Sequence, residues 1–171
     1  IGMAMVGAAK GYSVRLIMPG SKSPERQQIM QAYGADLELV EGDISDARER
    51  ADELSDTGDF VQLRQFENPA NPRVHYETTG GELIEQVGDR TVDALVAGVG
   101  TGGTISGTGR RLREAFPDIQ IVAVEPANNA VLSGQEPGTG DDSFQGMGPG
   151  FVSENLDVDL IDDVLTVTLA D

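Results

Sequence analysis

The chain has 171 residues, enough for one hydrophobic core or for one lobe and part of another. It contains no cysteine and a single histidine, His75, which excludes disulfides and thiolate metal sites and disfavours a histidine metal cluster. No stretch approaches the roughly 18 uncharged apolar residues of a membrane helix. The formal net charge of −17 should repel nucleic acid and anionic membranes, so we expect neither as a partner.

The acidic residues are scattered along the chain, with 29 Asp and Glu against 12 Lys and Arg. Scattered charge argues against a disordered acidic tail. It favours a surface adapted to high salt, where mutual repulsion is screened; an ordinary acidic protein is the alternative. The first residues lack the basic segment of a signal peptide, and the missing initiator methionine suggests a chain that starts inside a longer one. We expect a soluble, cytoplasmic protein.

The first 65 residues predict alternating helices and strands. An apolar segment before Gly11 predicts a buried helix with a glycine stop. Ser23 and Pro24 predict a helix start, because serine is a good N-cap and proline fits the first helical position. The expected order is helix 1–10, strand 14–18, helix 24–33, strand 37–40, helix 44–54 and strand 60–63.

The remaining residues continue this alternation. The expected elements are a helix from Asn71 to Val87 weakened at Gly80-Gly81, strand 94–97, helix 104–115, strand 121–124 and strand 164–167. The apolar run 94–97 is typical of a strand buried on both faces. The alternation predicts parallel βαβ units in an α/β sheet. A Gly- and Pro-rich stretch, 133–150, predicts a long functional or mobile loop, and a lobe boundary is expected near residues 65–72.

The most informative segment is residues 98–104, GVGTGGT, between the strand 94–97 and the following helix. Glycines allow backbone N–H groups to crowd round an anion, and a helix N-terminus adds unpaired donors and partial positive charge. The hydroxyls of Thr101 and Thr104 supply further donors. The segment therefore predicts a phosphate cradle. Because no Lys-Ser or Lys-Thr ends it, a P-loop nucleoside triphosphatase is disfavoured.

Two kinds of phosphate ligand fit this spacing. Gly98, Gly100 and Gly103 satisfy the G-x-G-x-x-G dinucleotide fingerprint, with Glu125 about 20 residues later as the acid for a ribose hydroxyl. A single phosphate monoester, as on pyridoxal phosphate, fits as well. A tight turn that binds nothing is a third alternative, and spacing alone does not separate them.

Several segments resemble the cysteine synthase and cystathionine β-synthase family and occur in the family's order. They are 100–104 (GTGGT), 65–72 (QFENPANP), 75–80 (HYETTG), 124–126 (VEP), 132–134 (LSG) and 145–152 (QGMGPGFV). The resemblance covers essentially all 171 residues. Two stretches, 65–72 and 146–151, look more like cysteine synthases than their cystathionine-forming relatives.

The resemblance implies pyridoxal 5′-phosphate as cofactor, with its phosphate held by Gly100, Thr101, Gly102, Gly103 and Thr104. It implies that Gln65 helps to bind the carboxylate of the amino-acid substrate, where a neutral amide donates without burying a charge. It places Gly146 in a loop at the mouth of the site. The family's Schiff-base lysine lies upstream and does not match Lys10 or Lys22, so no catalytic residue and no metal ligand is assigned within this chain.

The resemblance also implies a fold and a reaction. The fold is the two-lobed parallel-sheet α/β fold of the tryptophan synthase β-like (fold type II) pyridoxal-phosphate enzymes, incomplete at both ends, with residues 1–65 in the smaller lobe and 66–171 in the larger. The reaction is a β-replacement that makes L-cysteine from O-acetylserine and sulfide in an intact homodimeric enzyme. Cystathionine β-synthase and serine dehydratase are alternatives within the family. A NAD-dependent oxidoreductase using residues 98–103 and a non-enzymatic partner-binding domain are alternatives outside it.

Overall fold

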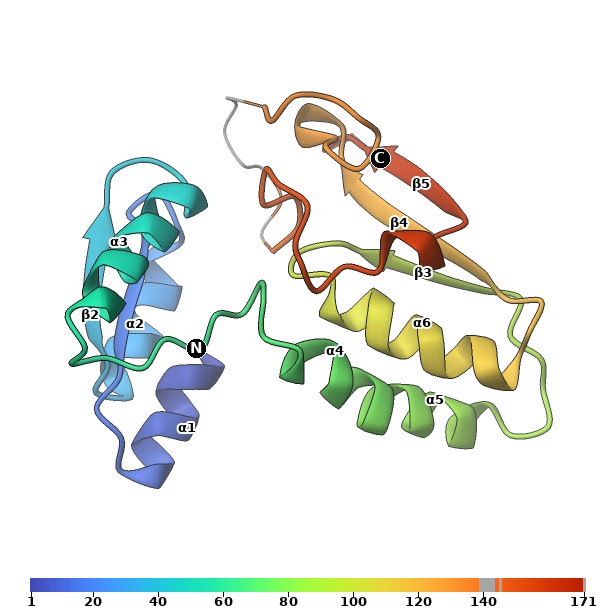
Figure 1. Ribbon diagram of the computed structural model, residues 1–171, viewed down its shortest axis with the longest axis horizontal. Coiled ribbons are helices and arrows are strands. Elements are labelled where there is room, and N and C mark those ends of the chain that lie inside the picture. The colour runs from blue at the N-terminus through green and yellow to red at the C-terminus, as the bar shows by residue number, and fades with distance from the viewer. Residues whose placement is uncertain (139–143, 145, 171) are drawn as a thin grey trace. The chain divides into compact units, whose positions relative to one another are not determined.

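A computed structural model describes residues 1–138, 144 and 146–170 of the chain. The chain forms two compact units, residues 1–62 and 63–171, each containing a parallel sheet (Figure 1). The division falls close to the predicted lobe boundary, and the assignment of each unit to a lobe stays a prediction. Positions 139–143 and 145 of the predicted long loop lie outside the described residues. No helix that the described residues form is long and apolar enough to cross a membrane.

The first unit combines two parallel strands with three helices among its residues, all of which are described. Its elements are α1 (Gly2–Lys10), β1 (Arg15–Pro19), α2 (Pro24–Ala32), β2 (Asp36–Val40) and α3 (Ile44–Asp56). The predicted caps are confirmed, because Gly11 ends α1 at φ 75° and the Ser23 side chain accepts a hydrogen bond from the Arg26 N–H. The apolar side chains of Ala4 and Met30 are buried in its core.

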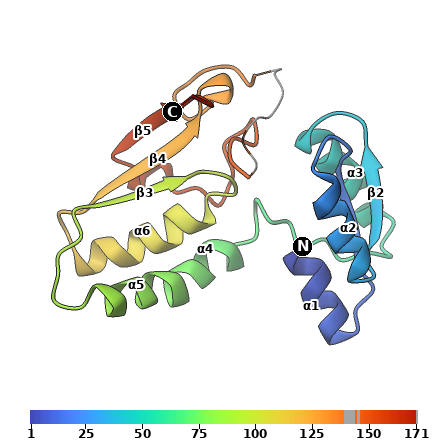
Figure 2. The same cartoon turned by 180° about the vertical axis from the view of Figure 1, so that it is seen from behind.

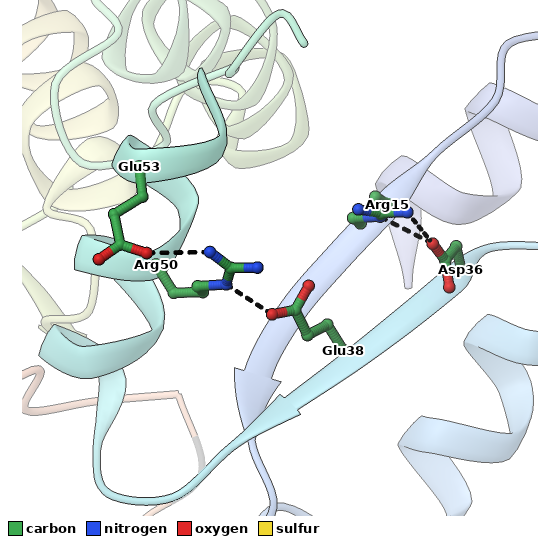
Figure 3. Close-up of polar contacts among 5 residues, drawn as sticks. All are labelled: Arg15, Asp36, Glu38, Arg50 and Glu53. Atoms are coloured by element: carbon green, nitrogen blue, oxygen red, sulfur yellow. Dashed lines mark hydrogen bonds and ion pairs between the residues drawn. The ribbon is translucent and has the colours of Figure 1, made fainter. Parts of the chain in front are cut away.

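Arginine–carboxylate pairs join the elements of this unit (Figure 3). Arg50 on α3 donates to Glu38 on β2 at 2.6 Å and to Glu53 at 2.9 Å. The hydrogen bond to Glu38 is the main reason that the pKa of Arg50 is raised, and Glu53 adds to it. Arg15 and Asp36 form a second pair across the two strands, at 2.7 Å. Because these side chains are partly exposed, we expect each pair to add little to stability.

The second unit contains a parallel sheet in the order β3-β4-β5. Its elements are α4 (Ala70–Val74), a π-helical turn (His75–Thr79), α5 (Gly80–Val87), β3 (Ala94–Gly98), α6 (Gly103–Ala115), β4 (Gln120–Pro126), the 3-10 turns Ala127–Asn129 and Val158–Leu160, and β5 (Asp163–Val167). β3 and β4 pair from Ala94–Gln120 to Gly98–Val124, so the carboxyl ends of both strands meet at one edge. The loop after β3 therefore lies at the edge where parallel sheets usually bind ligands.

Helix α6 lies between this sheet and the helical stretch formed by α4, the π-helical turn and α5 (Figures 1 and 2). Its apolar face packs on the sheet in a core around Ile105, Leu112 and Ile121, all at most 2% exposed. Its opposite face contacts the helical stretch closely. There the Gly107 position adjoins the Pro72 carbonyl oxygen, and a side chain would overlap it. The core thus fixes the start of α6 with respect to both the sheet and residues 70–79.

Four local predictions are wrong. Helix α1 is not a buried helix, since Met5 and Val6 are both 47% exposed and only Ala4 and Gly7 of this helix are buried. Residues 60–63 form no strand, and Val61 is 91% exposed, because an apolar run becomes a strand only when it pairs with another strand. β3 is not buried on both faces, since Val96 is 59% exposed. The helix from residue 70 to residue 87 is irregular at 75–79 and not at Gly80-Gly81. Gly80 is buried, and a Cβ there would lie 2.6 Å from Arg111 Cβ, so this glycine lets α5 approach α6.

Candidate functional site

The segment 98–104 connects the end of β3 to the start of α6, as predicted. The Val99 N–H donates to the Val124 carbonyl at 3.0 Å, which holds the segment against β4. Gly102 adopts a left-handed conformation with φ 79° and ends the loop, and its carbonyl accepts the first helical hydrogen bond, from the Ser106 N–H. The N–H groups of the first turn of α6 have no partner within the helix; that of Gly103 lies 3.4 Å from Thr101 Oγ1, and the others are available to an anion at this end.

Glycine is required along this loop because other groups fill the space of a side chain. A Cβ on Gly98 would overlap the Met147 sulfur, and one on Gly100 would overlap the carbonyl oxygen of Gly146. At Gly102 a Cβ would lie 2.7 Å from Leu156 Cβ. The absence of side chains therefore lets the loop pack closely against these neighbours and leaves its backbone N–H groups uncovered by Cβ atoms. A small, densely charged anion such as a phosphate monoester fits such a cradle.

The two threonines of the loop are held by different partners. Thr101 Oγ1 accepts a hydrogen bond from Asn71 Nδ2 at 2.9 Å. Thr104 Oγ1 lies 3.2 Å from His75 Nε2, and His75 Nδ1 lies 3.0 Å from Thr79 Oγ1. His75 and Thr79 belong to the π-helical turn, a feature found often at functional sites. The hydroxyls that the sequence singles out are thus held in place from α4 and from this turn.

Gln65 lies next to the loop through its own backbone. Its carbonyl oxygen accepts two side-chain hydrogen bonds, from Asn71 Nδ2 at 3.0 Å and from Asn155 Nδ2 at 2.9 Å. The next carbonyl, that of Phe66, accepts from the Asn155 N–H at 3.1 Å. The exposed Gln65 side chain therefore starts from a fixed backbone beside Thr101.

Ser153 connects the segment that contains Gln65 and Phe66 directly to the loop 98–104. Its Oγ lies 2.8 Å from the Phe66 carbonyl oxygen and 2.6 Å from that of Thr101, so one hydroxyl hydrogen serves both acceptors. Ser153 is 4% exposed and Asn155 is 6% exposed, which keeps water from competing for these bonds. Residues 65–71 and 153–155, far apart in the sequence, thus meet at the loop 98–104.

Gly146 lies against the same loop from the other side. Its carbonyl is the group that faces Gly100, and the nearby Gly148 N–H donates to the Val99 carbonyl at 2.9 Å. Gly146 has φ 95°, a conformation that L side chains rarely adopt. The structure therefore brings together the predicted phosphate-binding residues, Gln65 and Gly146. Whether each contacts a ligand stays a prediction.

Glu125 is occupied within the protein. It is 1% exposed, and its two carboxylate oxygens accept hydrogen bonds from the Leu132 N–H and the Ser133 N–H, both at 2.8 Å, and from the Ser133 hydroxyl at 2.7 Å. These bonds hold the turn after β4 in place. The dinucleotide interpretation requires this carboxylate to bind a ribose hydroxyl, and a buried group with these partners is unavailable for that role.

Sequence reasoning missed Asn71, Ser153 and Asn155 as parts of the site. They act on backbone carbonyls and on a hydroxyl far away in the sequence, so no spacing rule points to them. One signal was present. Asn71 and His75 lie four residues apart on a predicted helix, which puts them on one face, and the structure shows that this face meets the start of α6.

Known proteins resemble the chain over its full length. All of it, residues 1–171, matches the family of pyridoxal-phosphate dependent enzymes. A cysteine synthase from Staphylococcus aureus is 46% identical over 169 residues, which cover 98% of this chain and 54% of the relative. A solved cysteine synthase from Entamoeba histolytica has a TM-score of 0.88 at 36% identity and covers 99% of this chain and 50% of its own. The chain spans about half the length of the relatives it matches.

A further solved structure is that of a hydrogen sulfide-producing enzyme from Fusobacterium nucleatum. It has a TM-score of 0.91 at 36% identity and covers 99% of this chain and 57% of its own. Together these likenesses confirm the predicted fold class, the parallel-sheet α/β fold of the fold type II pyridoxal-phosphate enzymes. They also favour pyridoxal phosphate over a dinucleotide as the ligand of the loop.

Proposed function

We propose, since the chain belongs to the family of pyridoxal-phosphate dependent enzymes, that the protein is a cysteine synthase. The proposed reaction replaces the acetoxy group of O-acetylserine by sulfide. The bond between Cβ and the acetoxy oxygen breaks, acetate leaves with the electron pair, and a bond from sulfur to Cβ forms. The 46% identity to a relative named cysteine synthase, over 98% of this chain, is the observation that carries the proposal.

We assign the phosphate of pyridoxal phosphate to the loop that joins β3 and α6. The proposed ligands are the backbone N–H groups and hydroxyls of Gly100, Thr101, Gly102, Gly103 and Thr104. The glycine loop, the hydroxyls and the helix N-terminus suit a doubly charged phosphate. When bound, the cofactor supplies an electron sink for negative charge at the α-carbon of an amino acid.

The remaining assignments concern the substrate. Gln65 donates its side-chain amide to the carboxylate of O-acetylserine, and its anchored backbone limits how far that amide moves. Gly146 lies in a loop at the mouth of the site, where its positive φ shapes the backbone around Gly100. We also propose that residues 1–65 belong to the smaller lobe and 66–171 to the larger, and that the protein is a cytoplasmic homodimer.

The test is product formation by the protein at its natural length. We expect a visible absorbance band from bound pyridoxal phosphate that shifts on addition of O-acetylserine, and L-cysteine once sulfide is added. The control is the Gln65→Ala variant, which should raise KM for O-acetylserine more than it changes cofactor binding. A protein that forms cystathionine from serine and homocysteine, or deaminates serine, but makes no cysteine would refute the assignment in favour of another family member.

A further inference from the structure

Among the described residues, only the Asn71 side chain donates hydrogen bonds both to the backbone carbonyl of Gln65 and to a hydroxyl of the proposed phosphate loop, residues 98–104. It stands near the start of α4, opposite the start of α6. Its Nδ2 lies 3.0 Å from the Gln65 carbonyl oxygen and 2.9 Å from Thr101 Oγ1. Its Oδ1 occupies the space that a Cβ of Gly103 would need. The position of the amide is therefore fixed from three directions.

Hydrogen-bond chemistry also fixes which way round the amide lies. A backbone carbonyl can only accept, so the Asn71 nitrogen must be the atom that faces Gln65. The same nitrogen carries the second hydrogen, which points to Thr101. Gln65 O then has both lone pairs used, one by Asn71 and one by Asn155. The Asn71 amide therefore cannot be turned by 180°, because its oxygen would then face the Gln65 carbonyl oxygen.

This orientation determines what the Thr101 hydroxyl can do. Both hydrogen bonds that the described residues make to Thr101 Oγ1, from Asn71 Nδ2 and from the Gly103 N–H at 3.4 Å, use the oxygen as acceptor. The hydroxyl hydrogen is then left to donate, and phosphate oxygens only accept. A donor held in advance costs less entropy when the anion binds than one that must be reoriented.

We propose that Asn71 is a positioning residue for the cofactor phosphate, because it makes the Thr101 hydroxyl an obligate donor and ties that donor to the Gln65 segment. The proposal rests on the phosphate-loop assignment made above. It does not require that the product be cysteine. Asn71 itself touches neither the phosphate nor the substrate and acts through Thr101 and Gln65.

Asn71→Asp is the sharpest variant, because it preserves shape but replaces the donor by an acceptor. The Thr101 hydroxyl would then donate to the new carboxylate and turn its oxygen towards the phosphate. Asn155→Asp is the matched control. This substitution removes the other side-chain hydrogen bond to the Gln65 carbonyl oxygen. Among the described residues, Asn155 makes no hydrogen bond to Thr101. If Asn71→Asp does not fold, Asn71→Leu is measured in its place, because leucine is uncharged and of similar size.

The measurement is the affinity of the cofactor-free protein, at its natural length, for pyridoxine 5′-phosphate. This compound has the phosphate but no aldehyde, so the readout is independent of covalent attachment and of turnover. We expect Asn71→Asp to weaken binding roughly 10- to 100-fold, as loss of a charge-assisted hydrogen bond does, and Asn155→Asp to change it less than about three-fold. Circular dichroism confirms that each variant is folded.

Thr101→Val separates the proposed route from simple charge repulsion. If Asn71→Asp acts through the hydroxyl, its effect should shrink to a small fraction in the Thr101→Val background. An effect of equal size in both backgrounds, or equal effects of the two aspartate variants, would overturn the proposal. A wild type that binds the probe and makes no cysteine would refute only the proposed reaction. A wild type that does not bind the probe would refute both.

Discussion

Helix α6 contains two interior glycines, Gly107 and Gly109, whose replacement by alanine should have opposite effects on stability. Both lie in the same helix, two residues apart, and gain the same intrinsic preference from alanine, about 1 kcal/mol. They face different neighbours. A Cβ on Gly107 would overlap the Pro72 carbonyl oxygen and lie 2.9 Å from His75 Cβ. A Cβ on Gly109 would lie 3.1 Å from Leu160 Cδ2.

The nature of the contacted atom decides which effect wins. Leu160 Cδ2 is the end of a rotatable side chain and can move by the few tenths of an ångström required, so Gly109→Ala should be neutral or stabilising by up to about 1 kcal/mol. The Pro72 carbonyl is backbone, and it moves only if α4 moves away from α6. Overpacking costs about 1–3 kcal/mol, and a backbone group that cannot turn aside should lie at the upper end of this range, about 3 kcal/mol. After the helix gain of about 1 kcal/mol is subtracted, Gly107→Ala should be destabilising by about 2 kcal/mol.

Urea unfolding followed by far-UV circular dichroism measures the difference. We expect the midpoint of Gly107→Ala to fall and that of Gly109→Ala to stay or rise, with similar slopes. Because Asn71 directly precedes Pro72, Gly107→Ala should also weaken binding of pyridoxine 5′-phosphate, whereas Gly109→Ala should not. Equal midpoints for the two variants would refute the close approach of α4 to α6 on which the position of Asn71 depends.

Three other outcomes concern charge and buried polar groups. The Ile121 N–H first, and then Arg113, lower the pKa of Asp162, so its contribution to stability is present above about pH 4 and is lost as the pH falls through the folded-state value. The free energies of unfolding of wild type and Asp162→Asn should therefore converge in acid, and a difference between them that stays constant with pH would contradict this. Glu125→Gln should lower the free energy of unfolding by about 1–3 kcal/mol in urea titrations, because its amide would turn one N–H towards a backbone N–H; an unchanged midpoint would argue against the buried bonds. Salt should raise the melting temperature, since it screens repulsion within a chain of net charge −17, and a melting temperature that falls steadily up to molar salt would exclude the high-salt hypothesis.

The local structure was predictable wherever its cause was local. Ser23-Pro24 and Gly11 act through the conformation of their own residues, and both helix ends lie where the sequence places them. The alternation of strands and helices likewise predicts the parallel pairing that the structure contains. Errors arose where structure depends on what another part of the chain does. Residues 60–63 have the composition of a strand but no ladder among the described residues.

The position and backbone geometry of the loop 98–104 were predictable because its constraints are carried by the loop itself. Its glycines, its hydroxyls and its place between a strand and a helix are all visible in residues 98–104. The residues that orient it were not predictable. Ser153 meets Thr101 across 52 positions and Asn155 meets Gln65 across 90, and a serine or an asparagine at those places has no pattern of its own.

Glu125 and Thr101 show how hydrogen-bond capacity distinguishes a structural polar residue from a binding one. Both were candidates for ligand binding by position. Glu125 is 1% exposed and accepts three hydrogen bonds from the protein, so its carboxylate has a structural role and does not bind a ligand. Thr101 is used as an acceptor by Asn71, and its own hydrogen is left over at the N-terminal end of α6, where an anion is favoured. Position along the sequence makes both residues candidates for ligand contacts, but the hydrogen bonds that each already makes distinguish them: the Glu125 carboxylate has its donors within the protein, whereas the Thr101 hydroxyl keeps a hydrogen that it can donate.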